Sequence, residues 1–341
     1  MNPLQQAIRR LADGESLSSA DTGAAFDLVM AGEASAVQVA ALLTALRVKG
    51  ETPDELAGAA LALRRVMRPV GIATPDRVVD TCGTGGGRVG TLNVSTGAAF
   101  IVAGAGVPVA KHGNRSFTSR CGSADVLEAL GIDVELGPEE VPRVLEAANI
   151  AFLFAPVFHP AMRHAAPVRR ELAVPTIMNL LGPLANPAGV TRQVLGVADA
   201  RRAPLLAGAL RQLGCRHALV VHADVGMDEV SPSGCTRIWE VTERGVLPWV
   251  LEPREHGLDA PDLDELAGGE PVANAARLEA VLAGRDTGAA RAALLLNAAA
   301  ALYVAGREWS FHEALVEARR SLESGAALQA LERLRRASPR G

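Results

Sequence analysis

Short β-branched runs alternate with helix-like stretches from Arg77 onward, and this alternation restricts most of the chain to an α/β fold. Six runs have strand-like composition: 77–83, 107–113, 132–136, 150–156, 193–199 and 217–222. The stretches between them, such as 123–131 and 138–149, carry apolar residues at helical spacing. Strand, helix, strand repetition indicates a mostly parallel central sheet with helices on its faces. The loops at the carboxyl ends of such strands are the usual ligand site.

The first 70 residues instead predict four short helices. Asn2 and Pro3 mark the start of one helix, and Thr52, Pro53 and Glu55 form a capping box with a proline in the first turn of another. Segment 166–190 contains four prolines and is expected to form short helices that contribute to the same helical domain. We therefore expect a small all-helical domain at 1–72 and a larger α/β domain at 73–341. Ala-rich helices are expected over the last part of the chain.

The charge balance and cysteine pattern argue against several protein classes. Acidic residues outnumber basic ones, 38 to 34, so neither nucleic acid nor an anionic membrane is an expected partner. No apolar run reaches the roughly 18 residues of a membrane span, and residues 1–16 lack the apolar core of a signal peptide. The four cysteines include no C-x-x-C pair, which argues against a zinc site or a disulfide framework. A cytoplasmic protein with free thiols is expected.

The glycine-rich run GTGGGRVG follows the first predicted strand and precedes the polar sequence TLNVST. Gly85, Gly87 and Gly90 fit the dinucleotide-binding pattern, but no acidic residue follows about 20 positions later to hold a ribose. A P-loop would need a lysine within the run, which is missing. A turn without a ligand remains an alternative. The hydroxyl and amide side chains that open the next helix favour a phosphate-binding loop.

Two further loops carry polar residues that suit an anion and a metal ion. The sequence KHGNRSFTSRCGSAD follows the next predicted strand, so it is expected at the same edge of the sheet. A solvated surface loop could hold the same residues, but two such loops after neighbouring strands favour one anion pocket. Asp228 and Glu229 follow the strand that ends near His222. Carboxylates placed against a polyphosphate suit Mg²⁺.

Together with these loops, the motifs FAPVFHPAM, PVRREL and NLLGPLANP resemble the anthranilate phosphoribosyltransferase family of tryptophan biosynthesis over most of the chain. The resemblance implies a helical domain joined by hinge segments to the α/β domain, and a homodimer formed through the helical part. It implies a glycosyltransferase (pentosyltransferase) in which the anthranilate amine attacks C1 of 5-phosphoribosyl 1-diphosphate. N-(5-phosphoribosyl)anthranilate and diphosphate are the products. A nucleoside phosphorylase and a sensor that binds a phosphoribosyl ligand without turnover remain alternatives.

The resemblance also implies the site residues, none of which is a clear general acid or base. Anthranilate contacts are expected from Gly83, Asn114 and Arg169, and Mg²⁺ contacts from Ser95, Asp228 and Glu229. Gly87 stands where the family usually has aspartate, so one carboxylate near the diphosphate is missing. The expected contacts with the phosphoribosyl donor are Gly83, Gly86, Gly87, Thr91, Asn93, Val94, Ser95, Thr96, Lys111, His112, Gly113, Asn114, Arg115, Ser116, Phe117, Thr118, Ser119 and Ser123.

Overall fold

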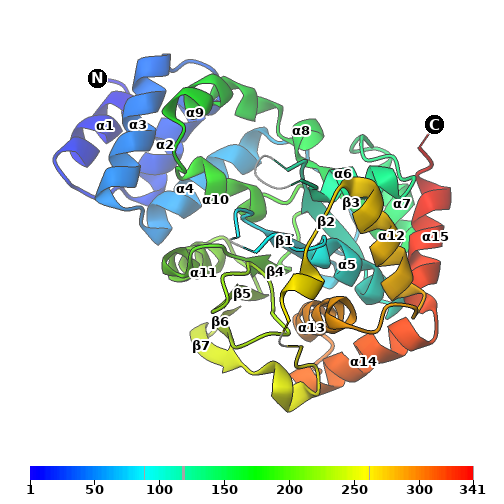
Figure 1. Cartoon of the computed structure of the whole chain (residues 1–341). Coiled ribbons are helices and arrows are strands. Elements are labelled where there is room, and N and C mark those ends of the chain that lie inside the picture. The colour runs from blue at the N-terminus through cyan, green and yellow to red at the C-terminus, as the bar shows by residue number, and fades with distance from the viewer. Residues whose placement is uncertain (88, 117–119, 261, 341) are drawn as a thin grey trace.

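A computed structural model describes residues 1–87, 89–116, 120–260 and 262–340, which form a small helical lobe and a larger α/β lobe (Figure 1). The small lobe holds α1 (Pro3–Ala12), α2 (Ser19–Met30), α3 (Ala36–Lys49) and α4 (Pro53–Val66). The predicted caps are confirmed: the side chains of Asn2 and Thr52 accept backbone N–H groups of their helices. Glu55 completes the second capping box by accepting the Thr52 N–H at 2.8 Å. The predicted helical domain is confirmed.

The larger lobe is built on a seven-stranded sheet with the order β3-β2-β1-β4-β5-β6-β7. Strands β1 to β5 are parallel, and β6 and β7 extend the sheet as an antiparallel hairpin, so the predicted mostly parallel sheet is confirmed. The strand order changes direction between β1 and β4, and ligands of such sheets bind at this switch point. The strands are β1 (Val79–Gly83), β2 (Val109–Gly113), β3 (Ile150–Phe154), β4 (Arg192–Gly196), β5 (His217–Ala223), β6 (Thr236–Thr242) and β7 (Gly245–Leu251).

Helices cover both faces of this sheet and separate two apolar cores. The side chains of Val194 and Val221 enter one core, while those of Leu195 and Val220 on the opposite face enter the other. The first core is closed by α5 (Val94–Gly104), α6 (Ser123–Ala129), α7 (Val141–Ala148), α12 (Pro271–Leu282), α13 (Ala289–Tyr303), α14 (Phe311–Glu323) and α15 (Ala326–Ala337). The predicted Ala-rich C-terminal helices are thus confirmed.

The second core joins the sheet to the helical lobe. Helix α11 (Ala203–Gln212) lies between the sheet and α4, and its apolar residues share one cluster with those of the four N-terminal helices. The proline-rich segment forms the short helices expected of it: α9 (Ala166–Leu172) contacts α3, and α10 (Met178–Leu181) contacts α4. A short helix, α8 (Ala155–Phe158), follows β3 directly. The remaining turns are 3-10: η1 (Pro75–Arg77), η2 (Pro160–His164), η3 (Gly182–Leu184), η4 (Ala200–Arg202), η5 (Pro253–His256) and η6 (Asp264–Leu266).

Two features of the sheet differ from the sequence prediction. The prediction of a strand at 132–136 is wrong. The side chains of Ile132 and Val134 are buried, but the backbone of this segment forms a single β-bridge, between Ile132 and Pro339 near the end of the chain. The expectation failed because an extended apolar segment can pack against a terminus as well as join a sheet. The hairpin of β6 and β7 was not predicted. Pro248 is tolerated there because β7 is an edge strand.

None of the helices in the described part of the chain combines the length and hydrophobicity of a membrane span. The four cysteines are free thiols, as predicted.

Candidate active site

The loops after β1 and β5 meet at the carboxyl edge of the sheet, at the boundary between the two lobes (Figure 1). The Asp228 carboxylate lies directly against the glycine-rich loop. A Cβ atom placed on Gly87 would lie 2.7 Å from Asp228 Oδ1, and one on Gly83 would lie 3.2 Å from Asp228 Oδ2. At Gly196, the end of β4, a Cβ would lie 1.6 Å from the Asp228 carbonyl oxygen. Because glycine has no Cβ atom, the loop that carries Asp228 and Glu229 (the acidic loop) can lie directly against the glycine-rich loop.

Glu229 is held by the start of helix α5. The Thr91 hydroxyl donates to Glu229 Oε2 at 2.9 Å, and the Ser95 backbone N–H donates to the same carboxylate. Burial, followed by the neighbouring charge of Asp228, raises the pKa of Glu229 to about 8. Burial also raises the pKa of Asp228. A cation bound beside these two carboxyl groups would stabilise their ionised forms, so the pair favours cation binding.

The side chain of Lys111, near the end of β2, also reaches the start of α5. Its ammonium group is buried, donates to the Thr81 carbonyl oxygen, and donates to Ser95 Oγ at 3.1 Å. Burial lowers the pKa of Lys111, and the negative charge of Asp80 opposes that shift. The strand ends of β1, β2 and β5 therefore converge on Ser95, Glu229 and Asp228.

Other residues predicted to contact the phosphoribosyl donor form hydrogen bonds that connect the loops and helices around this site. The Asn114 N–H donates to Ser123 Oγ at 3.2 Å, which ties the loop after β2 to the start of α6. Asn93 donates to the Cys121 carbonyl oxygen at 3.1 Å and accepts from Asn274 at 3.0 Å. Asn274, on α12, is a contact that the sequence analysis missed, because it lies 181 positions away in the chain.

Some predicted contacts are placed differently or cannot be described. Arg115 pairs with Glu128 at 2.6 Å and with Asp125 at 3.1 Å, and its guanidinium lies over the Phe154 ring. Its charge is therefore directed at α6 in this structure. The Thr96 hydroxyl is buried and has no partner among the described residues. The predicted contacts Phe117, Thr118 and Ser119 lie outside the described residues.

Arg169, the expected anthranilate contact, lies on α9 and is half-buried, while Arg170 is exposed. Burial lowers the pKa of Arg169. Its guanidinium has neither a hydrogen bond nor an ion pair with the part of the chain that the structure describes. A half-buried guanidinium without an anion favours binding of a planar carboxylate from a ligand.

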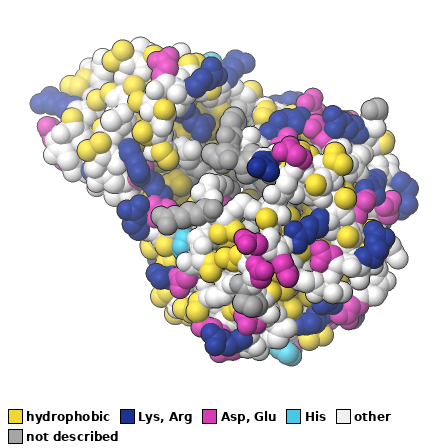
Figure 2. Space-filling view, viewed as in Figure 1, with side chains coloured by type: hydrophobic (Ala, Val, Ile, Leu, Met, Phe, Trp, Pro, Cys, Tyr) yellow, Lys and Arg dark blue, Asp and Glu magenta, His cyan; other side chains and the backbone are white. Residues whose placement is uncertain are grey.

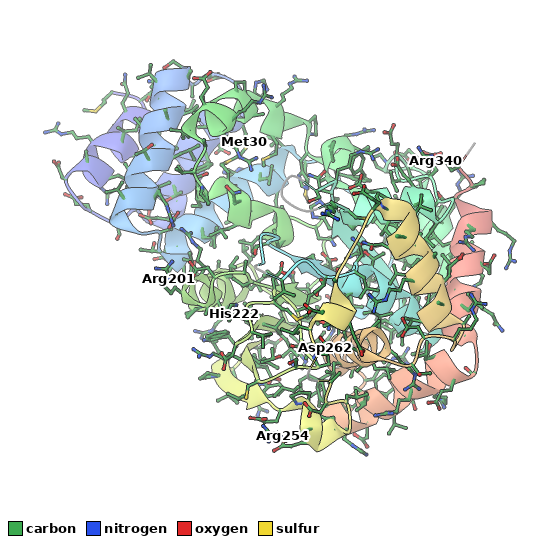
Figure 3. All side chains as sticks on the ribbon, in the orientation of Figure 1. Met30, Arg201, His222, Arg254, Asp262 and Arg340 are labelled. Carbon is green, nitrogen blue, oxygen red and sulfur yellow. The ribbon has the colours of Figure 1, made fainter. Side chains whose placement is uncertain are left out.

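Basic side chains lie on both lobes near the junction between them (Figure 2). His222 is the second-last residue of β5 and lies just before the loop that carries Asp228 and Glu229, in the larger lobe (Figure 3). Its Nδ1 lies 2.8 Å from the Val197 carbonyl oxygen, so this ring nitrogen carries the proton when the ring is neutral. The contact fixes the start of the acidic loop to the end of β4.

Residues 75–328 match a family model described as "Glycosyl transferase family, a/b domain", and residues 5–67 match its "helical bundle domain". An anthranilate phosphoribosyltransferase of Rubrobacter xylanophilus is 52% identical over 337 residues, which are 99% of this chain and 98% of the relative. The chain belongs to the anthranilate phosphoribosyltransferase family. The family resemblance drawn from the motifs is therefore confirmed.

Solved structures of this family have the same fold. The anthranilate phosphoribosyltransferase of Thermus thermophilus superposes with a TM-score of 0.91 at 44% identity, over 99% of both chains. An anthranilate phosphoribosyltransferase from Saccharomyces cerevisiae, in complex with PRPP and Mg, superposes with a TM-score of 0.89 at 32% identity, over 98% of this chain and 97% of the yeast chain.

The residues at the acidic loop fit a magnesium ion. Asp228, Glu229 and the Ser95 hydroxyl offer hard oxygen ligands, and Mg²⁺ prefers one or two carboxylates completed by water and substrate oxygens. No group of three or more His, Cys, Asp or Glu side chains with metal-ligand geometry occurs among the described residues. A metal held here would therefore depend on substrate oxygens, as Mg²⁺ does at phosphate sites.

Replacing Gly87 by aspartate is expected to lower the half-saturating Mg²⁺ concentration about threefold or more, because it adds a third carboxylate beside Asp228. Magnesium titrations of activity, with Gly87→Ala as the matched control, would measure this. The alanine variant carries the same Cβ without the charge, so it isolates the steric effect. Superimposable titration curves for the aspartate and alanine variants would show that the missing carboxylate is neutral for metal binding.

A buried histidine pair lies beside the site. His112 Nε2 and His159 Nε2 are 3.2 Å apart, and His112 Nδ1 lies 3.1 Å from the Gly182 carbonyl oxygen. Burial and the neighbouring ring lower the pKa of His112 to about 3, and burial lowers that of His159 to about 4. Both rings are therefore neutral at pH 7.

This pair predicts a loss of stability in mild acid. Between pH 6.5 and about 4 the unfolded chain binds protons that the folded rings exclude, so the free energy of unfolding falls as the pH is lowered through this window. In His159→Gln, proton uptake on unfolding is expected to fall by about half a proton at pH 6.5 and by nearly one proton at pH 5. Urea unfolding at several pH values would measure the change. An unchanged slope would contradict the assignment of a neutral His159.

Proposed function

We propose that this chain transfers the 5-phosphoribosyl group of 5-phosphoribosyl 1-diphosphate to the amine of anthranilate. The products are N-(5-phosphoribosyl)anthranilate and diphosphate, and the reaction is a step of tryptophan biosynthesis. One observation carries the proposal: the strand ends of β1, β2 and β5 converge on Ser95, Glu229 and Asp228 in a chain 52% identical to an anthranilate phosphoribosyltransferase.

The proposed diphosphate site is the described parts of the glycine-rich loop, 83–87 and 89–91, together with the first turn of α5. Glycine allows backbone N–H groups to come close to phosphate oxygens, and Gly85 and Gly86 have positive φ angles of 67° and 82° that other residues rarely adopt. The positive end of the helix dipole at the start of α5 favours an anion. The remaining donor contacts predicted from the motifs are proposed to complete this site.

The chemistry consists mainly of stabilising the departing diphosphate. As the bond from C1 to the diphosphate oxygen breaks, positive charge develops on the ribose and negative charge on the leaving group. Lys111 is held by Thr81 and Ser95 before the reaction, so it can stabilise this charge without reorganising, and the N–H groups of the glycine loop are proposed to contribute in the same way. The anthranilate amine attacks as a neutral nucleophile and loses its proton after the new bond has formed. No general base is required.

Arg169 is proposed to hold the anthranilate carboxylate. A guanidinium pairs with both oxygens of a carboxylate in one plane, which orients the ring and its adjacent amine. The absence of an ion pair for Arg169 among the described residues supports this role, since a half-buried guanidinium is stabilised by an incoming anion. Gly83 and Asn114 are proposed as further anthranilate contacts.

Mg²⁺ is the proposed metal, since a yeast relative binds PRPP and Mg together. Ser95, Asp228 and Glu229 would hold it. When bound, it would supply positive charge that neutralises the two carboxylates and the diphosphate.

One assay tests the function directly. Wild-type protein with anthranilate, 5-phosphoribosyl 1-diphosphate and Mg²⁺ is expected to convert anthranilate fluorescence into that of its phosphoribosyl product. Phosphate with thymidine or uridine serves as the control for nucleoside phosphorylase activity. Turnover only in this control would support a phosphorylase, and donor binding without turnover in either assay would support a sensor.

A homodimer through the helical lobe is proposed from its exposed apolar side chains. Val37 and Val48 on α3 are 78% and 81% exposed, and Leu61 and Val66 on α4 are each 39% exposed. Covering such side chains in a symmetric contact is a common use of an apolar face. Light scattering at several concentrations is expected to give twice the mass of one 35.4 kDa chain, and Val48→Glu to lower it. A single-chain mass at every concentration would contradict the proposal. A cytoplasmic location remains a prediction.

A further inference from the structure

Strands β1 and β2 are paired only at their beginning. Val79 and Val109 are the one registered pair between these two described strands. By contrast, β1 pairs with β4, and β2 with β3, over five residues each. The backbone groups of β1 and β2 beyond this first pair therefore need other partners, at the point where both strands enter the proposed donor site.

Where β1 and β2 are not paired, a side chain of each strand forms a hydrogen bond with the backbone of the other. Asp80 of β1 accepts the backbone N–H of His112 on β2 at 3.0 Å, and Lys111 of β2 donates to the backbone carbonyl of Thr81 on β1. Asn186 joins both strands, because its amide donates to Asp80 Oδ2 at 2.8 Å and to the Ala110 carbonyl oxygen at 2.9 Å. These contacts replace the missing ladder hydrogen bonds.

The bridging charges are fully enclosed. Asp80 is 0% exposed and Lys111 is 3% exposed, so neither charge is compensated by water. Burial raises the pKa of Asp80 and lowers that of Lys111, and each charge favours the ionised form of the other. Removing one charge would therefore leave the other buried without compensation.

We propose that Asp80 is a positioning residue for the phosphoribosyl donor. It holds the ends of β1 and β2 at the separation that places Lys111, and through it Ser95, beside the diphosphate. Asp80 accepts the backbone N–H of His112 at 3.0 Å, and the preceding residue, Lys111, donates to Ser95 Oγ at 3.1 Å. This inference rests on the proposed donor-binding function.

A double-mutant cycle tests the inference. Asp80→Asn is expected to raise the donor KM about tenfold or more and to leave the anthranilate KM within about twofold, because the residue acts through Lys111. In a Lys111→Met background, the same substitution is expected to add less than about threefold, since its route to the donor is already lost. Losses that multiply would overturn the inference, as would equal changes in both KM values.

Melting temperatures test the same coupling if Asp80→Asn is too unstable for kinetics. The Asp80→Asn/Lys111→Met double variant removes both charges, so it is expected to melt at or above the Tm of the less stable single variant. A double variant that melts below both single variants would overturn the coupling.

Glu55→Gln is the matched control, because Glu55 is also a 0% exposed carboxylate that accepts backbone N–H groups, but it lies in the helical lobe, where it pairs with Lys49. It is expected to lower Tm without moving the donor KM. A donor KM raised equally by Glu55→Gln would mean that general destabilisation explains the effect, and would overturn the role of Asp80. The wild-type turnover assay decides the proposed function separately from these outcomes.

Discussion

Glu229→Gln is expected to lower kcat by roughly a hundredfold, which is the scale of losing one prearranged electrostatic contact to a reacting group. Glutamine keeps the shape, and its amide oxygen can still accept the Thr91 hydroxyl, so this contact with the start of α5 is retained. What it removes is the negative charge that would hold Mg²⁺ beside the diphosphate. Turnover and Mg²⁺ dependence are therefore expected to weaken together, while the anthranilate KM changes little.

The matched control for this result is Asp224→Asn on the same loop. Asp224 is an exposed acid that pairs with Arg237 at 2.7 Å, away from the glycine loop. Exposed pairs of this kind contribute little to stability, so its activity and metal titration should match the wild type. Wild-type metal titration curves for Glu229→Gln and Asp228→Ala would remove both residues from the site.

Arg169→Ala is expected to raise the anthranilate KM by roughly thirtyfold, since a charge-assisted bidentate pair contributes about 2 kcal/mol. The donor KM should stay within about twofold, because the proposed donor contacts lie at the ends of β1 and β2, in the loops after them and at the starts of α5 and α6 rather than on α9. Steady-state kinetics with each substrate varied in turn would separate the two effects. A lysine at this position should recover only part of the loss, because an ammonium cannot pair with both oxygens in one plane.

Arg170→Ala provides the neighbouring control. Arg170 is exposed and lies on the same short helix, and its replacement removes the same charge from the molecule. The anthranilate KM of this variant is expected to match the wild type. Equal increases in both KM values for Arg169→Ala, or a similar effect in Arg170→Ala, would contradict a specific carboxylate contact.

Local patterns were sufficient for most elements of the fold. The caps at Asn2 and Thr52 were predictable because the side chain and the N–H it accepts lie within one turn. Five of the six predicted strands exist, since each contains a short run with β-branched or other apolar residues that the sheet buries. The segment around Ile132 has the same composition, but it packs against the end of the chain, and no local pattern distinguishes these two outcomes.

The candidate site was predictable where neighbouring residues share a motif. Asp228 and Glu229 could be placed at the glycine loop because parallel strands end at one edge of a sheet. Asp80, Asn186 and Asn274 were missed, because their roles depend on contacts between distant parts of the chain. The ion pair between Arg115 and Glu128 could not be predicted either, since an arginine in a loop can reach several acidic residues.

A crystal structure of the protein soaked with 5-phosphoribosyl 1-diphosphate and Mn²⁺ would show whether the glycine-rich loop and the acidic pair bind the donor together. We expect diphosphate density between the loop from Gly83 to Gly87 and the acidic pair, with an anomalous metal peak in contact with Asp228 or Glu229. We also expect C1 of the ribose to face the side of the site that holds Arg169. Donor density elsewhere on the molecule, or a metal peak remote from both carboxylates, would contradict the proposed site.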